Sequence, residues 1–156
     1  MVVPRPGQDH TRAVAFDVGK LLRLWTEPLP PGAAAEDAFR EVYADPVTVN
    51  GAPLTAADMV ARARALQAAL ADVERTVLDV VDDGSRVAVA FRLRGRHVGT
   101  LATAAGPLAP TGAVLDLRVL DVLVLAAGRV ATIWMAADEL GALTAAGAVR
   151  LVAQEA

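Results

Sequence analysis

The sequence predicts an α+β fold in which three N-terminal helices pack against a curved antiparallel sheet and enclose one pocket. Three observations favour this fold. Apolar residues recur every three or four positions in the first half of the chain, which is the period of a helix buried on one face. The period then changes to two, which is typical of strands. Hydrophobic residues make up 54% of the chain and charged residues 21%, so the chain is able to bury a core.

The first two helices are read from their apolar faces and their stops. Residues 11–26 carry one apolar stripe that ends near Trp25, and a run of prolines and a glycine then stops the helix. Glu36 opens a short second helix, because acidic residues favour a helix N-terminus. Tyr43 lies on the apolar face of this helix, and Pro46 ends it.

A short strand and a third helix follow. Residues 47–49 predict a strand that enters a turn at Asn50. Thr55 is expected to cap the next helix, with Asp58 three residues later, and the apolar stripe continues to Leu70.

Alternating residues then predict a meander of strands. Residues 73–81 and 87–93 form a long hairpin, 106–112 read as a loop, and 114–125 and 129–135 form a second pair of strands. We therefore expect the helices on one face of a strongly bent sheet.

The chain is expected to form one domain. Its boundaries are a flexible N-terminus at 1–10, an α+β domain at 11–149 that closes with a short helix at 138–143, and a tail at 150–156.

Composition excludes several functions. The net charge of -3 and the 4% aromatic content argue against nucleic-acid binding, and the lack of cysteine excludes disulfides and thiolate chemistry. His10 and His97 are not expected to converge on a metal, and no phosphate-binding glycine loop is present. No signal peptide or membrane span is recognised, which predicts a cytoplasmic location. Abundant alanine and arginine indicate a GC-rich bacterial gene.

Two polar residues fall on apolar strand faces. His97 is in step with Phe91 and its neighbours, where it is either a hydrogen-bonded structural residue or a proton donor or acceptor that faces the pocket. Asp121 lies in the apolar row of the next long strand. It is expected either to pair with a nearby arginine or to face a cavity, since burying an unpaired carboxylate costs several kcal/mol.

Three residues near strand ends have both a structural and a functional interpretation. Asp138 is either a charge at a helix N-terminus or a general acid or base at the pocket mouth, with Trp134 as a wall. Asn50 is either a turn residue or an amide that binds a substrate carbonyl.

Several strings resemble the SnoaL-like polyketide cyclases, a branch of the nuclear transport factor 2-like superfamily with a cone-shaped α+β barrel. They are residues 22–25, 39–45, 95–99, 110–112, 128–134 and 138–143. The resemblance implies an intramolecular aldol closure that uses a pocket carboxylate, Asp138 or Asp121, with His97 and Asn50 lining the pocket and without metal or cofactor. It also implies a polyketide-like carbonyl substrate. The aromatic side chains expected at the substrate are Trp25, Tyr43, Phe91 and Trp134.

Two further functions remain open at this point. One is the opening of an epoxide, with Asp121, Asp138 and an arginine, Arg92 or Arg94, although alternation places these arginines on the face opposite His97. The other is a binding protein without catalysis, which needs only the pocket. An apolar face on the convex side of the sheet predicts a homodimer.

Overall fold

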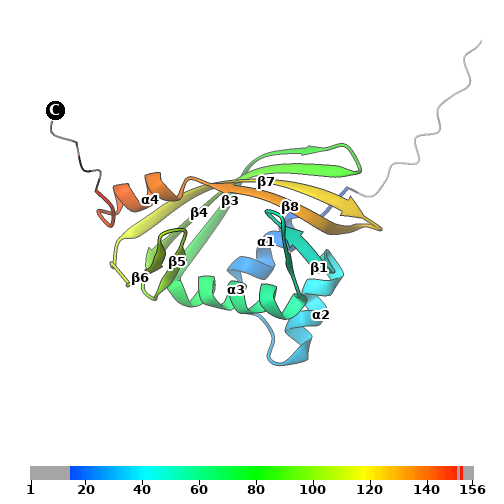
Figure 1. Cartoon of the computed structure of the whole chain (residues 1–156), viewed down its shortest axis with the longest axis horizontal. Helices are drawn as coiled ribbons and strands as arrows, with labels where there is room; N and C mark the ends of the chain where they lie inside the picture. Colours follow the sequence, from blue (N-terminus) through cyan, green and yellow to red (C-terminus); the bar gives the residue numbers. More distant parts are fainter. Residues whose placement is uncertain (1–14, 151, 153–156) are drawn as a thin grey trace, which may run out of the picture.

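The computed structural model of the chain describes residues 15–150 and 152. Helices and a small hairpin lie beneath a curved sheet of six strands (Figure 1). The elements are α1 (Val18–Thr26), α2 (Ala33–Val42), β1 (Tyr43–Val49), β2 (Ala52–Leu54), α3 (Ala56–Ala69), β3 (Leu70–Asp82), β4 (Arg86–His97), β5 (Leu101–Thr103), β6 (Gly106–Leu108), β7 (Val114–Ala126), β8 (Arg129–Ala137) and α4 (Glu139–Ala145). The predicted α+β class, with helices α1, α2 and α3 against a curved sheet, is confirmed.

Capping residues set where the helices begin. The Asp17 side chain accepts a hydrogen bond from the Lys20 N–H and starts α1. Thr55 and Asp58 form the predicted capping box of α3, in which each side chain accepts from the backbone N–H of the other. These caps fix the first residues of α1 and α3, whose buried apolar residues belong to the core.

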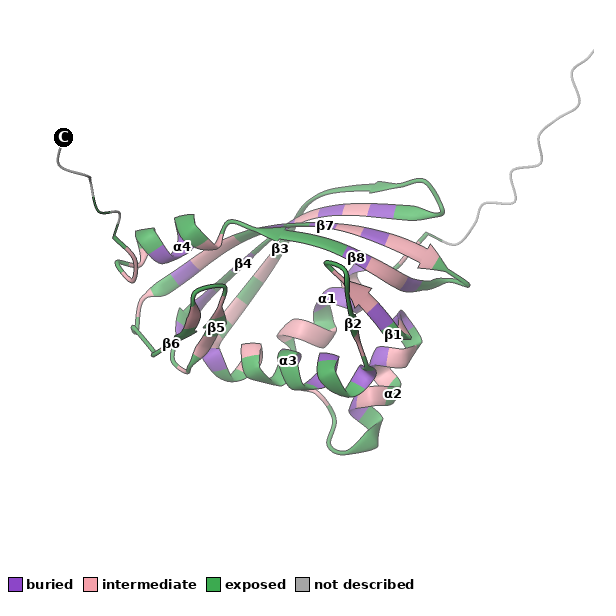
Figure 2. Cartoon of the chain, in the orientation of Figure 1, coloured by how far each residue is buried: buried purple, intermediate pink, exposed green. Residues whose placement is uncertain are grey.

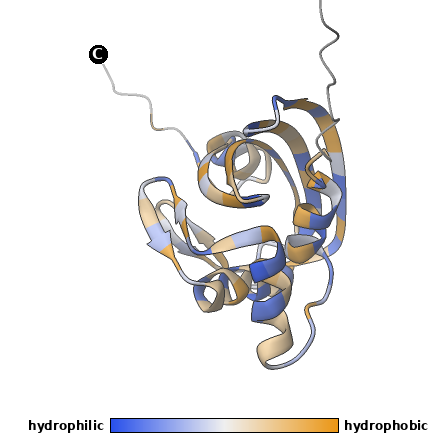
Figure 3. Cartoon of the chain, turned by 90° about the vertical axis from the view of Figure 1, so that its right-hand side faces the viewer, coloured by the Kyte–Doolittle hydropathy of each residue, from blue (hydrophilic) through white to orange (hydrophobic). Residues whose placement is uncertain are grey.

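The main sheet has the strand order β2-β1-β8-β7-β4-β3. Residues alternate between its two faces, and along the strands hydrophobic and hydrophilic positions alternate as the sheet curves over the helices (Figure 3). The inner face carries the buried residues of the core, whereas the end of the β3–β4 hairpin is exposed (Figure 2). The pocket lies on this inner face.

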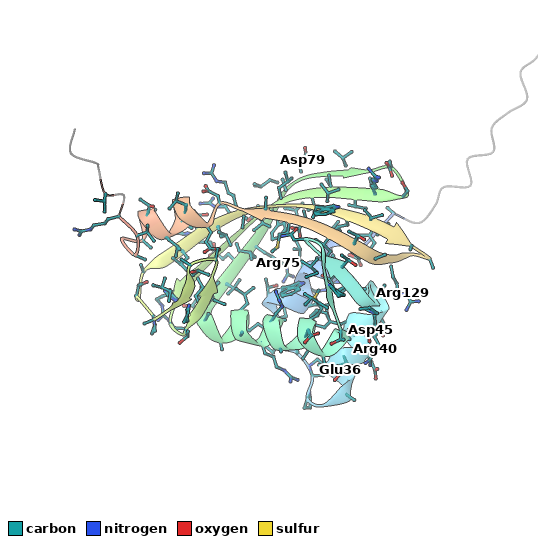
Figure 4. The ribbon with its side chains drawn as sticks, in the orientation of Figure 1. Glu36, Arg40, Asp45, Arg75, Asp79 and Arg129 are labelled. Carbon is teal, nitrogen blue, oxygen red and sulfur yellow. The ribbon has the colours of Figure 1, made fainter. Side chains whose placement is uncertain are left out.

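An ion-pair cluster fixes the corner between α2, β1 and α3. Arg40 donates to Glu36 and to Asp45, and the three side chains lie together in Figure 4. Asp45 also accepts the backbone N–H of Ala56 at the start of α3. This corner sets the position of Tyr43, the first residue of β1.

Four details of the sequence prediction are wrong. The sheet is mixed and not fully antiparallel, because β1 runs parallel to β8, and period-two alternation is the same for both directions. Tyr43 begins a strand and is not helical, since its backbone is extended and α2 ends at Val42. Helix α1 begins at Val18, because Asp17 caps it, so residues 15–17 of the helix predicted at 11–26 are not helical, and its residues 11–14 lie outside the described part of the chain. The predicted loop at 106–112 contains β6, which pairs with β5.

Two predicted segments fall largely outside the described residues. These are the flexible N-terminus at 1–10 and most of the tail at 150–156.

Candidate functional site

A cavity of about 370 Å³ lies between the inner face of the sheet and the helices. Its walls come from α1, α3, β4, β7 and β8, and from β5 and α4 at one end. Most of the lining is aliphatic or aromatic, with few polar groups, which is the usual character of a small-molecule site.

Asp121 is the buried carboxylate of this cavity. Its side chain lies on the inner face of β7, and the residue is 6% exposed. The cross-strand neighbours that share its face are Val89 on β4 and Met135 on β8, both apolar. Among residues 15–150 no hydrogen-bond donor or cation contacts it, and its Oδ1 atom is fully buried without a partner. The pairing with an arginine that the sequence allowed is therefore absent from the described part of the chain.

Burial changes the proton affinity of this carboxyl. Because the charged form loses its hydration, the pKa of Asp121 rises from its usual value near 4 to about 6. At neutral pH most molecules therefore carry the carboxylate, which is a stronger base than an exposed one. A pKa near the working pH is what general acid–base catalysis favours.

Tyr43 supplies a second polar group to the same cavity. Its Oη accepts a hydrogen bond of 2.9 Å from the Trp25 Nε1–H, and its ring stacks on Phe39. Burial raises the pKa of the Tyr43 phenol well above its usual value, the bond from Trp25 lowers it, and the charge of Asp121 raises it. The phenol therefore keeps its proton, and no acceptor for that proton lies among the described residues.

Two other polar lining residues are already engaged. The Thr26 hydroxyl donates to the Leu22 carbonyl. Glu139, at the start of α4, accepts the backbone N–H of Ala104 at 2.9 Å and so joins α4 to the β5–β6 hairpin. The lining groups left for a ligand are Asp121, the Tyr43 hydroxyl and Arg62.

His97 is fully buried, as its place in the alternation predicts, but it lies at the end of β4 and does not line the cavity. The Thr111 N–H donates to Nδ1, so the neutral ring carries its proton on Nε2. Backbone bonds from His97 N–H to Ala113 and from Gly112 N–H to His97 complete a clasp between β4 and the loop before β7. The ring thus fixes the loop that follows the β5–β6 hairpin.

Asp138 lies outside the cavity. It is the N-cap of α4, accepts the Gly141 N–H, and pairs with Arg118 at 3.0 Å. A Cβ at Gly141 would lie 2.5 Å from the Asp138 Oδ1 atom, so a side chain at this position would displace the capping carboxylate. The structure therefore does not bring Asp138 and Asp121 together.

The remaining candidates divide between the cavity and the surface. Trp25 and Phe91 line the cavity with Tyr43. Asn50 uses its amide to bridge the backbone N–H and carbonyl of Met135, and Trp134 is 56% exposed on the outer face.

Sequence reasoning missed Arg62, which lines the cavity from α3. Its spacing from Met59 and Leu66, which both face the cavity, was the available signal.

No group of three or more metal-binding side chains occurs in the part of the chain that the structure describes. No described helix is long and apolar enough to cross a membrane.

The comparisons with known proteins agree with this architecture. The family model for SnoaL-like polyketide cyclases matches residues 22–146. The chain belongs to this family. Among curated proteins, no sequence gives a significant match.

Solved structures of low sequence identity share the fold. TsrD from Streptomyces laurentii has a TM-score of 0.70 at 18% identity, over 84% of this chain and 92% of that one. A candidate SnoaL-like polyketide cyclase from Jannaschia sp. CCS1 has a TM-score of 0.67 at 24% identity, over 92% and 100% of the two chains. AclR, a candidate hydroxylase from Streptomyces galilaeus, has a TM-score of 0.62 at 17% identity, over 85% and 96%. The fold is therefore shared by proteins with different described activities.

Proposed function

We propose that this SnoaL-like protein is a cofactor-independent cyclase or isomerase that removes a proton next to a carbonyl group of a polyketide-like substrate. The observation that carries the proposal is the unpaired carboxylate of Asp121 in an otherwise apolar cavity wall. Holding a charge there opposes folding. A catalytic role would explain why this carboxylate is kept at a cost in stability, because the base must contact the substrate.

The reaction can be written with these residues alone. Asp121 takes a proton from the carbon beside a carbonyl, and the electrons of the broken C–H bond form an enolate. Tyr43 donates its free hydroxyl proton as a hydrogen bond to the enolate oxygen. In a cyclase, the enolate carbon attacks a second carbonyl of the same molecule and forms a C–C bond, and the resulting alkoxide takes the proton back from Asp121.

The two alternatives differ in what they need. Epoxide opening by paired carboxylates needs Asp138 and an arginine beside Asp121, but Asp138 pairs with Arg118 outside the cavity, and Arg92 donates to Asp116. A binding protein needs only the apolar cavity and remains the second candidate. The presence of an unpaired carboxylate in the wall favours catalysis over binding alone.

Hydrogen exchange on a neutral ketone tests the proposal. The probe is the methyl ester of β-naphthoylpropionic acid in heavy water, and NMR follows deuterium entering the carbon beside the ketone. We expect the wild-type protein to exceed Asp121→Asn by about a hundredfold or more. Asp138→Asn, which keeps a capping side chain outside the cavity, is the matched control and should retain the wild-type rate. Equal exchange by the wild-type protein and Asp121→Asn would leave binding as the function.

We also propose a homodimer through the outer face of the sheet. A row of apolar residues crosses β3, β4, β7 and β8 at Val81, Ala88, Val122 and Trp134, each paired with the next. Leu120, 51% exposed, adjoins this row. The same face carries charges of both signs, such as Arg92 and Asp116, which a two-fold axis can bring into register between two copies.

Sedimentation tests the dimer. Trp134→Asp should convert a dimeric wild-type protein to a monomer, because a charge would replace the largest apolar side chain of the row. Leu140→Asp, at an equally exposed position on α4, should leave the dimer intact. A monomeric wild-type protein would contradict this proposal without affecting the assignment of Asp121.

A further inference from the structure

Arg62 is the cation of the cavity lining. It lies on α3, three residues after Met59 and four before Leu66, and all three side chains line the cavity. Residues at these spacings share one helix face. Arg62 is itself exposed, so it lies where the cavity meets solvent.

The guanidinium of Arg62 is uncommitted within residues 15–150, where it makes no hydrogen bond or ion pair. Its neighbour Arg64 instead donates to the Pro30 carbonyl. The nearest acid along the helix, Asp58, is held by the N–H and the hydroxyl of Thr55; the charge of Arg62 helps to lower the pKa of this carboxyl, but no hydrogen bond or ion pair joins the two side chains. Arg62 therefore presents its N–H donors to the cavity mouth without an acceptor among the described residues.

Neither acidic group of the described lining forms an ion pair with Arg62. Glu139 accepts the Ala104 N–H, and Asp121 is buried in the wall away from solvent. The cavity thus has a base inside, a cation at its edge and apolar walls between them. This arrangement suits a ligand with a carbonyl group, an apolar body and an anionic end.

We propose that Arg62 binds a carboxylate at one end of the substrate, so that the substrate class is apolar keto acids. The identification as a substrate rests on the proposed function, whereas the binding of an apolar acid does not. A guanidinium can hold both oxygens of a carboxylate, which fixes orientation as well as charge. Anchoring one end would select which carbonyl reaches Asp121.

A matched pair of ligands tests the proposal. β-Naphthoylpropionate carries the carboxylate, and its methyl ester has the same body without the charge. Calorimetry should show that the wild-type protein binds the acid about fivefold more tightly than the ester, an effect typical of a partly exposed charge pair. The preference should weaken at high salt, since the contact is near solvent.

Variants of Arg62 and Arg64 test whether the preference for the acid depends on the charge of Arg62. Arg62→Ala should lose the preference for the acid and bind the ester as the wild-type protein does. Arg62→Lys should retain part of the preference, because lysine keeps the charge but not the paired donors. Arg64→Ala, two residues away and outside the lining, should keep the full preference.

The binding preference for the acid over the ester does not depend on catalysis. Asp121→Asn should keep the preference for the acid even where it loses hydrogen exchange. A wild-type protein that binds the acid no better than the ester would overturn the role of Arg62, as would a preference that survives in Arg62→Ala. Either result would leave exchange on the ester, and so the proposed function, intact.

Discussion

The two faces of the sheet differ in whether their acidic side chains form ion pairs. On the outer face, arginines and acids pair: Arg92 of β4 pairs with Asp116 of β7, and Arg118 of β7 pairs with Asp138, the N-cap of α4. On the inner face, Asp121 has no partner among the described residues. Strand β7 contributes to both faces, so the same strand holds a paired and an unpaired carboxylate.

The pKa values of Asp116 and Asp121 move in opposite directions. The hydrogen bond from Arg92 holds the pKa of the Asp116 carboxyl below its usual value. Burial raises the pKa of Asp121 to about 6. An ion pair makes the Asp116 carboxylate part of the structure. Burial without an ion pair makes the Asp121 carboxyl a stronger base and lowers the stability of the fold. The following predictions test this contrast, from the largest effect to the smallest.

Asp121→Asn should stabilise the protein above pH 7 by up to about 3 kcal/mol, the free energy that corresponds to a pKa raised from 3.8 to about 6. The folded wild-type chain binds its proton more tightly than the unfolded chain. Its stability therefore falls as pH rises through this range and then levels off. The gain from the substitution should shrink toward zero below pH 4, which urea unfolding at several pH values measures. A gain that is independent of pH would contradict the burial of an ionised Asp121.

Tyr43→Phe should slow exchange on the neutral ketone by about a hundredfold, because the enolate oxygen loses its donor. The substitution keeps the ring that stacks on Phe39. The melting temperature should fall, because the Trp25 Nε1–H loses its acceptor, whereas the affinity for the methyl ester should change little. A slower rate that is explained entirely by weaker binding would place Tyr43 among the contacts of the pocket wall instead.

Asp138→Ala should destabilise the protein by about 1 kcal/mol, since α4 loses its N-cap. Exchange per folded molecule should not change, because this carboxylate lies outside the cavity. Thermal unfolding and the NMR exchange assay together check both parts. A large loss of exchange in the folded variant would return Asp138 to the candidate site.

Asp116→Asn should have the smallest effect and the opposite sign to Asp121→Asn. It removes an ion pair from the exposed outer face, so a slight loss of stability is expected at neutral pH and a smaller one in acid. Parallel urea titrations of the two variants provide the comparison.

The alternation of residues predicts the faces of this sheet but not the contacts across it. The inward positions of His97 and Asp121 follow from period two alone. The bond of His97 with Thr111 and the pairing of Arg118 with Asp138 join residues that are 14 and 20 positions apart, which no local pattern encodes. The direction of β1 is also non-local, because its partner β8 lies near the other end of the chain.

The candidate site was only partly predictable for the same reason. Apolar spacing identified Trp25 and Phe91 as inward-facing residues, and both line the cavity. Arg62 was hidden because a charged residue within a helix is usually solvated. Its cavity-facing position depends on how α3 packs beneath the sheet.

Met135 on β8 lies directly opposite Asp121 of β7, and Met135 is 46% exposed. A substitution of Met135 should therefore disturb the packing of the core little. Histidine or aspartate at this position would share a proton with Asp121 and turn a single base into a pair with two macroscopic titration steps. One position, and not a new fold, therefore separates the present pocket from a different acid–base repertoire.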